Sequence, residues 1–182
     1  LNEVSANNKK SGDWIEIFNY SEETVEVTDW VLTDLKNEFR LPAAEIAPND
    51  YLVICQDSTR FFQQHPLAYN VISGMDFGIN KRYETLQLFT ANGAAIDSMG
   101  YEIPPSDSVF TFNLLLPYLD NADIENWELR RGAGSPNSPN PYYVESSIRT
   151  EQEQYLQTGV AGALLLVFLF ILVSSRRRKQ AT

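Results

Sequence analysis

The sequence contains very few of the side chains on which most enzyme centres depend. His65 is its only histidine and Cys55 its only cysteine. A single histidine excludes a multi-histidine metal site built from this chain, and a single cysteine excludes an intrachain disulfide. The sequence also has no Walker A, G-x-G-x-x-G or G-x-S-x-G element, so the usual nucleotide-binding and serine-hydrolase motifs are missing. We therefore predict a chain with no catalytic residues, no metal site and no cofactor.

Positive charge is also scarce, except at the very end of the chain. The formal net charge is −10 over 182 residues. Residues 1–175 hold ten Lys and Arg residues against all 24 Asp and Glu residues, which gives this part a net charge of −14. A surface this acidic repels the phosphate groups of nucleic acid. We therefore expect no nucleic-acid partner.

Residues 154–175 carry no charge at all, and the chain is apolar at nearly every position from Gly159 to Val173. A helix of about 20 apolar residues spans the hydrocarbon core of a bilayer. The sequence thus predicts a transmembrane helix over residues 154–175. It would be embedded in membrane lipid through side chains that include Leu164, Leu165, Leu166, Phe168 and Phe170.

A basic cluster follows this segment directly and consists of Arg176, Arg177, Arg178 and Lys179. Such clusters favour the cytoplasmic side of a membrane. The predicted topology is single-pass, with an extracytoplasmic domain over residues 1–141, a juxtamembrane stalk over 142–153 and a cytoplasmic tail over 176–182.

The first 141 residues have the pattern of an all-β domain. Apolar runs or period-two alternation predict strands at 13–19, 51–55, 85–89 and 95–101. Asn92-Gly93 predicts a tight turn between the last two. One short helix is predicted over Ser58–Gln64, because this segment lacks Gly and Pro and ends before His65-Pro66. Many short strands at this spacing predict a β-sandwich.

Several side chains are predicted to be buried. Trp14 and Trp30 are large aromatics of the kind that fill a sandwich core. Cys55 ends an apolar run and is predicted to be a small buried hydrophobe. A later apolar run surrounds Pro117 and either belongs to the core or, if exposed, is the best candidate for a contact surface. Its members are Phe110, Phe112, Leu114, Leu115 and Tyr118.

An acidic segment, Asp120 to Glu125, invites comparison with a calcium loop. Calcium takes six to eight oxygen ligands, and this segment supplies part of such a set. The EF-hand spacing and its glycine are missing. We therefore favour a solvated acidic loop over a calcium site.

The chain resembles the lamin-tail domain family along most of the predicted β-domain. The resembling segments are Leu1–Val4, Asp13–Asn19, Val27–Asp34, Phe39–Pro42, Ile46–Asn49, Tyr51–Ile54, Phe77–Asn80, Glu84–Leu88, Gly93–Tyr101 and Gly134–Pro141. The resemblance implies an immunoglobulin-like β-sandwich without a shared catalytic centre, and bacterial members look like accessory modules of exported proteins. The insertion around residues 60–73 looks longer than the family minimum.

The sequence as a whole predicts a non-catalytic, membrane-anchored interaction module on the outer side of a bacterial membrane. We expect it to be the C-terminal part of a longer exported protein whose partner is another envelope protein or a glycan. Two alternatives are a spacer between the membrane and an upstream enzyme domain, such as a spore-coat-kinase-like domain, and a sortase-type sorting signal. The sortase alternative depends on Leu156–Gly159, which lacks the proline of L-P-x-T-G.

Overall fold

The computed structural model describes residues 1–6, 8–106 and 108–180, with side chains described as far as Leu169. The chain divides into two compact units, Leu1–Tyr142 and the residues from Tyr143 onward. The first unit is a β-sandwich and the second is a helix. The prediction of an all-β, immunoglobulin-like sandwich in the first unit is confirmed.

The larger sheet of the sandwich has six strands in the order β12-β11-β1-β2-β7-β8. Their bounds are β12 Trp127–Arg131, β11 Phe110–Leu114, β1 Glu3–Ser5, β2 Trp14–Asn19, β7 Asp50–Cys55 and β8 Val71–Ser73. β8 runs parallel to β7, and the other neighbours in this sheet are antiparallel.

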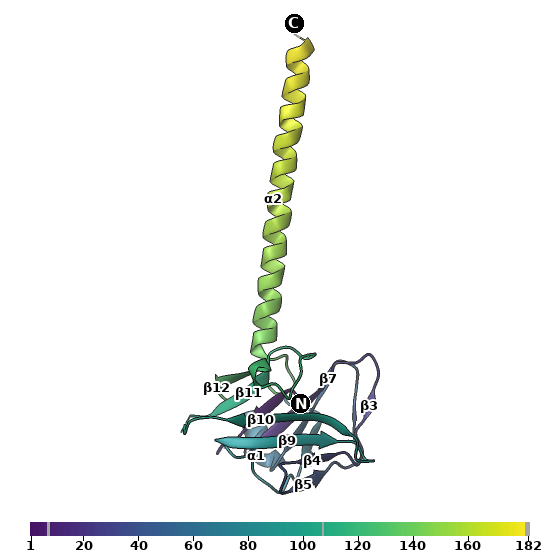
Figure 1. The fold of residues 1–182 in the computed structure, drawn as a ribbon, viewed down its shortest axis with the longest axis vertical. Coiled ribbons are helices and arrows are strands. Elements are labelled where there is room, and N and C mark those ends of the chain that lie inside the picture. The colour runs from purple at the N-terminus through teal and green to yellow at the C-terminus, as the bar shows by residue number, and fades with distance from the viewer. Residues whose placement is uncertain (7, 107, 181–182) are drawn as a thin grey trace. The chain divides into compact units, whose positions relative to one another are not determined.

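The second sheet has the order β10-β9-β4-β5, and a two-stranded ribbon pairs β3 with β6. The bounds are β10 Ala95–Glu102, β9 Tyr83–Phe89, β4 Val31–Thr33, β5 Glu38–Arg40, β3 Val25–Glu26 and β6 Glu45–Ile46. β9 and β10 form the hairpin drawn in teal in Figure 1. Its turn contains Gly93 at φ +83°, a left-handed conformation that glycine adopts without strain. The predicted turn at Asn92-Gly93 is confirmed.

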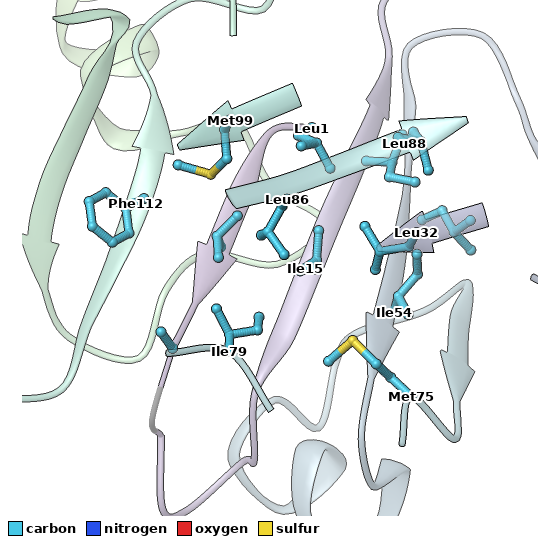
Figure 2. Packing of buried hydrophobic residues seen from close by; sticks show 14 of the residues in the cluster. Leu1, Ile15, Leu32, Ile54, Met75, Ile79, Leu86, Leu88, Met99 and Phe112 are labelled. Atoms are coloured by element: carbon cyan, nitrogen blue, oxygen red, sulfur yellow. The ribbon is translucent and has the colours of Figure 1, made fainter. Parts of the chain in front are cut away.

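The core lies between the two sheets because alternate residues of each strand point inward. In β2, Ile15 and Ile17 are buried in this core, and Leu52 and Ile54 face it from β7. Leu86 and Leu88 of β9 belong to the same cluster from the second sheet. Figure 2 shows four of these side chains, Ile15, Ile54, Leu86 and Leu88, gathered in one layer with other core residues.

The short helix α1, Ser58–Gln64, has the bounds that the sequence predicts. It begins after Asp57, whose carboxylate accepts hydrogen bonds from the backbone N–H groups of Thr59 at 2.8 Å and Arg60 at 3.2 Å. The helix ends at Gln64, two residues before Pro66. Its one buried side chain, Phe61, faces a second and smaller apolar cluster.

This second cluster corrects the prediction for Trp14. Trp14, Val53 and Cys55 alternate along β2 and β7 with residues of the main core, so they lie on the other face of the six-stranded sheet. The Trp14 and Phe61 rings pack edge to face with centroids 5.8 Å apart. Trp14 thus fills a satellite core under α1. Trp30 is partly buried against the main core, and the predicted burial of Cys55 is confirmed.

The second unit corresponds to helix α2, Pro141–Gln180. Within the part of the chain that the structure describes, no helix is both long enough and apolar enough to cross a membrane.

The prediction of a transmembrane helix over residues 154–175 is corrected accordingly, to a long helix without a membrane span in its described part. Of the predicted anchor residues, Leu164, Leu165, Leu166 and Phe168 are exposed on α2. The side chains of Phe170, Arg176, Arg177, Arg178 and Lys179 lie outside the described residues.

Candidate interaction site

The apolar run that the sequence offered as a contact surface is mostly buried. Phe110, Phe112 and Leu114 are 3%, 2% and 3% exposed, because alternate residues of β11 point between the sheets. Phe112 stacks on Tyr101 of β10 with ring centroids 4.1 Å apart. These three residues are therefore core residues, which is the first of the two alternatives that the sequence left open. Leu115 is half-buried after the strand ends, and Tyr118 is 68% exposed.

Tyr118 belongs to the loop of residues 115–123, which borders a cavity of about 440 Å³ at one end of the sandwich. We call this end the cavity end. β2 and β11 finish here, and β7 and β10 begin here. The cavity is lined by apolar side chains and a few polar ones from several parts of the chain: Leu1, Asn2, Ile17–Ser21, Val25, Val27, Trp30, Ile46, Ile96, Asp97, Leu114, Pro117, Leu119, Asp120 and Asn121. Volumes of this order are typical of sites that receive a small ligand or a side chain.

A hydrogen-bonded wall holds one side of the cavity in place. The buried Asn121 side chain donates to the Asp97 carboxylate and to the Leu1 carbonyl oxygen, both at 2.6 Å. The indole N–H of Trp127 donates to the backbone carbonyl of Asn121 at 2.9 Å. The backbone nitrogen of Leu1 also donates a hydrogen bond to the Asp97 carboxylate. The loop is thereby fixed to the first residues of β10.

A second hollow of about 280 Å³ adjoins the cavity and shares Ile96, Asp97 and Asp120 with it. Its other lining residues come from β9, β10 and the loop after Asn121: Gln87, Phe89, Ala95, Ser98 and Ala122. Two carboxylates thus lie where the hollows meet. Tyr20 and Ile96, which are 64% and 48% exposed, add apolar surface at the cavity end.

The loop of residues 120–125 does not form a calcium cage in the structure. Asp120 accepts a hydrogen bond from the N–H of Ala122, and Asp123 caps a short 3₁₀ helix at Ile124–Asn126 by accepting from Glu125, each at 3.0 Å. Among the described residues, no group of three or more His, Cys, Asp or Glu side chains could hold a metal ion. These carboxylates therefore shape the loop and leave acidic surface.

The two residues most often used as nucleophile or base lie in the satellite core, away from the cavity. Burial raises the pKa of the Cys55 thiol to about 11, so it stays protonated near neutral pH. His65 packs on Trp14 and Phe61 with ring centroids 5.7 and 4.9 Å apart, and burial lowers its pKa. Neither lines the cavity.

The structure also contains a buried pair of acids that the sequence did not reveal. Glu3 of β1 and Glu16 of β2 are direct cross-strand partners on the outer face of the six-stranded sheet, and both are fully buried. Burial raises the pKa of Glu3 to about 7, although hydrogen bonds from Ser135 and Thr111 oppose the shift. Burial raises the pKa of Glu16 to about 8, with a further rise from the charge of Glu3.

Residues 134–140, which we call the covering loop, close over this acid pair. The backbone N–H of Ser135 donates to Glu3 at 3.0 Å, and that of Asn137 donates to Glu16 at 2.5 Å. Asn140 is buried and donates to the Asn2 carbonyl at 2.9 Å. The only sign of the pair in the sequence is a glutamate at one outward position of each strand. This sign does not predict that β1 and β2 pair Glu3 with Glu16, or that residues 134–140 cover the two glutamates.

The family model described as Lamin Tail Domain matches residues 1–102. The match ends with β10, so the loop of residues 115–123 and the covering loop lie beyond it. No curated protein matches the chain. The resemblance drawn over residues 1–141 is therefore supported across the first ten strands.

Proposed function

The chain belongs to the lamin tail domain family, a family of non-enzymatic immunoglobulin-like domains, and we propose that it binds a protein partner at the cavity end of its sandwich. The observation that carries this proposal is the cavity of about 440 Å³, which has an apolar lining and two carboxylates on one wall. Sites that receive a ligand are typically concave, largely apolar and supplied with a few fixed polar groups.

The pre-formed wall favours binding here over binding at a flat face. Asn121, Asp97 and Trp127 are connected by hydrogen bonds of 2.6 and 2.9 Å, so the loop needs little further ordering when a partner arrives. Pre-organisation of this kind increases affinity because less conformational entropy is lost on binding. Exposed tyrosines such as Tyr20 and Tyr118 are frequent anchors in protein interfaces.

The titratable side chains at the cavity also favour a binding role. Among the described residues that line the cavity, two are aspartates and none is a histidine, cysteine or lysine. A serine or cysteine nucleophile would need such a base within hydrogen-bonding reach. A recognition role accounts for the same residues without any further group.

A photo-cross-linking pair tests this proposal. We expect a benzophenone amino acid in place of Tyr118 to cross-link a defined partner in the native cell, because Tyr118 lies beside the cavity. The matched control is Tyr83, which is 55% exposed but begins β9 at the opposite end of the sandwich. The partner is identified by mass spectrometry and then titrated against the purified full chain.

We expect Tyr118→Ala to weaken binding of that purified partner by about tenfold, the size of a moderate interface anchor. Tyr83→Ala should leave the affinity within about twofold. Equal cross-linking from both positions, or equal loss of affinity in both variants, would place the interface elsewhere.

A further inference from the structure

We infer that the partner presents a basic segment in which a lysine or arginine lies next to an apolar side chain. The apolar side chain would enter the cavity, and the cation would lie against Asp120 and Asp97. This inference rests on the proposed function and specifies the chemistry that the same site recognises.

The first reason is the distribution of charge between the two ends of the sandwich. Ten acidic residues lie on the loops and strand ends of the cavity end: Glu22, Glu23, Glu26, Asp29, Glu45, Asp50, Asp97, Asp120, Asp123 and Glu125. In the described part of the chain, Arg40 is the one lysine or arginine placed among them, and its guanidinium donates to the Asp29 carbonyl oxygen at 3.0 Å.

The cations of the first unit gather instead toward the opposite end, where the β1–β2 and β4–β5 connections, α1 and the end of β12 lie. They are Lys9, Lys10, Lys36, Arg60, Lys81, Arg82, Arg130 and Arg131. Acids such as Asp34, Asp57 and Asp76 lie among these cations, so the opposite end is close to neutral. The strongly acidic cavity end therefore steers a basic partner toward itself.

The second reason is the position of two carboxylates where the cavity and the adjoining hollow meet. Asp97 has only 20% of its side chain exposed, so water screens it less than a fully exposed acid. One of its oxygens accepts from Asn121 and the other from the N–H of Ser98 at 2.8 Å, which holds the carboxylate in place. Asp120 is exposed beside it and extends the acidic wall outward.

The third reason is the apolar lining next to these acids. Trp30 and Leu119 line the cavity and are only partly buried, so an apolar group of the partner would cover them. A cation alone would leave this surface wet, whereas an apolar side chain alone would place no positive side chain against the acidic wall. A segment that carries both kinds of side chain places its cation against the carboxylates and covers the apolar lining at the same time.

Affinity measurements with three short synthetic peptides test this inference. The peptides alternate Lys with Leu, Glu with Leu, or Lys with Ser, and their binding to the full chain is followed by fluorescence anisotropy at low and high salt. We expect the Lys–Leu peptide to bind at least about tenfold more tightly than either of the others. Its affinity should fall as salt is added, because salt screens exposed charges.

Two variants and a control locate the effect. Asp120→Asn is expected to weaken Lys–Leu binding about fivefold, and the Asp97→Asn, Asp120→Asn double variant about tenfold or more. Asp76→Asn changes an exposed acid after β8, at the opposite end, and should have an effect below about twofold. Circular dichroism checks the fold of each variant, and Asp120→Asn alone suffices if the double variant unfolds.

The outcomes separate this inference from the proposed function. Equal binding of the Lys–Leu and Glu–Leu peptides, equal binding of Lys–Leu and Lys–Ser, or no effect of Asp120→Asn would each overturn the inference. If the cross-linked partner still depends on Tyr118 in that case, the interaction site stands and only its chemistry is wrong. If the Tyr118 cross-link also fails, both the interaction site at the cavity end and its inferred chemistry are wrong.

Discussion

The free energy of unfolding is expected to fall by several kcal/mol as the pH is raised from about 5 to about 9, because Glu3 and Glu16 must ionise inside the protein. Burial raises their pKa values to about 7 and about 8, above the ordinary value of 4.5. Between pH 4.5 and these raised values, the folded chain keeps protons that the unfolded chain releases. Each unit by which a pKa is raised corresponds to about 1.4 kcal/mol of stability lost over this range.

The sign of the effect follows from the direction of the shifts. The stabilisation from a raised pKa is fully present below pH 4.5 and is lost as the pH rises through the folded-state values of about 7 and 8. Chemical denaturation at a series of pH values measures this loss. Surface groups also make the free energy of unfolding depend slightly on pH. This part is the same in the parent chain and in the variants, so the comparison between them removes it.

Glutamine is a suitable replacement because it has nearly the shape of a protonated glutamate and cannot ionise. The Glu3→Gln, Glu16→Gln double variant should therefore lose most of the pH dependence and be more stable than the parent at the alkaline end of the series. Glu22→Gln, at an exposed position, should keep the parental profile. A double variant with an unchanged profile would show that the pair does not control stability.

The second large effect is expected from Gly134→Ala, which should lower the free energy of unfolding by about 3 kcal/mol or more. Gly134 has φ +91°, and a Cβ atom there would lie 2.6 Å from the Trp14 ring and 2.7 Å from the Glu3 carboxylate. Both neighbours are fully buried and have little room to move. The covering loop must then lift away from the acid pair.

Gly93 provides the matched control, because it has φ +83° and no atom lies within 4 Å of the place that a Cβ atom would occupy. Gly93→Ala therefore bears only the cost of the left-handed backbone, about 1 kcal/mol. Denaturant titration measures both losses, and the fluorescence of Trp14 should change only in Gly134→Ala. Equal losses at the two positions would show that close packing on Trp14 adds nothing.

Local features of the fold could be predicted from the sequence where one periodic or capping signal decides them. The alternation of β2, the span Ser58–Gln64 of α1 and the turn at Asn92-Gly93 are of this kind. Hydropathy was less reliable for the C-terminal segment, where α2 is continuous from Pro141 and its described part does not qualify as a membrane span.

Features that depend on tertiary contacts could not be predicted. The pattern of β2 shows that Trp14 and Ile15 face opposite sides, but tertiary packing against α1, Ala68 and Val71 makes the Trp14 side a second core. The apolar run of β11 fits either the surface or the core as a sequence, and only its place beside β1 decides between them. The Glu3–Glu16 pair needs both the β1–β2 register and contacts with Ser135 and Asn137, more than 100 residues away.

Binding of the partner at the cavity end can be mapped residue by residue, through the chemical shifts of the isotope-labelled full chain during titration with the cross-linked partner. We expect the amide signals of residues 17–21, 95–98 and 118–121 to move most, because these segments form the walls of the cavity and of the adjoining hollow. Signals of residues 8–12, 34–38 and 58–64, at the opposite end, should stay within the noise. The largest changes in this second group, with residues 118–121 unmoved, would show that the cavity end is not the binding surface.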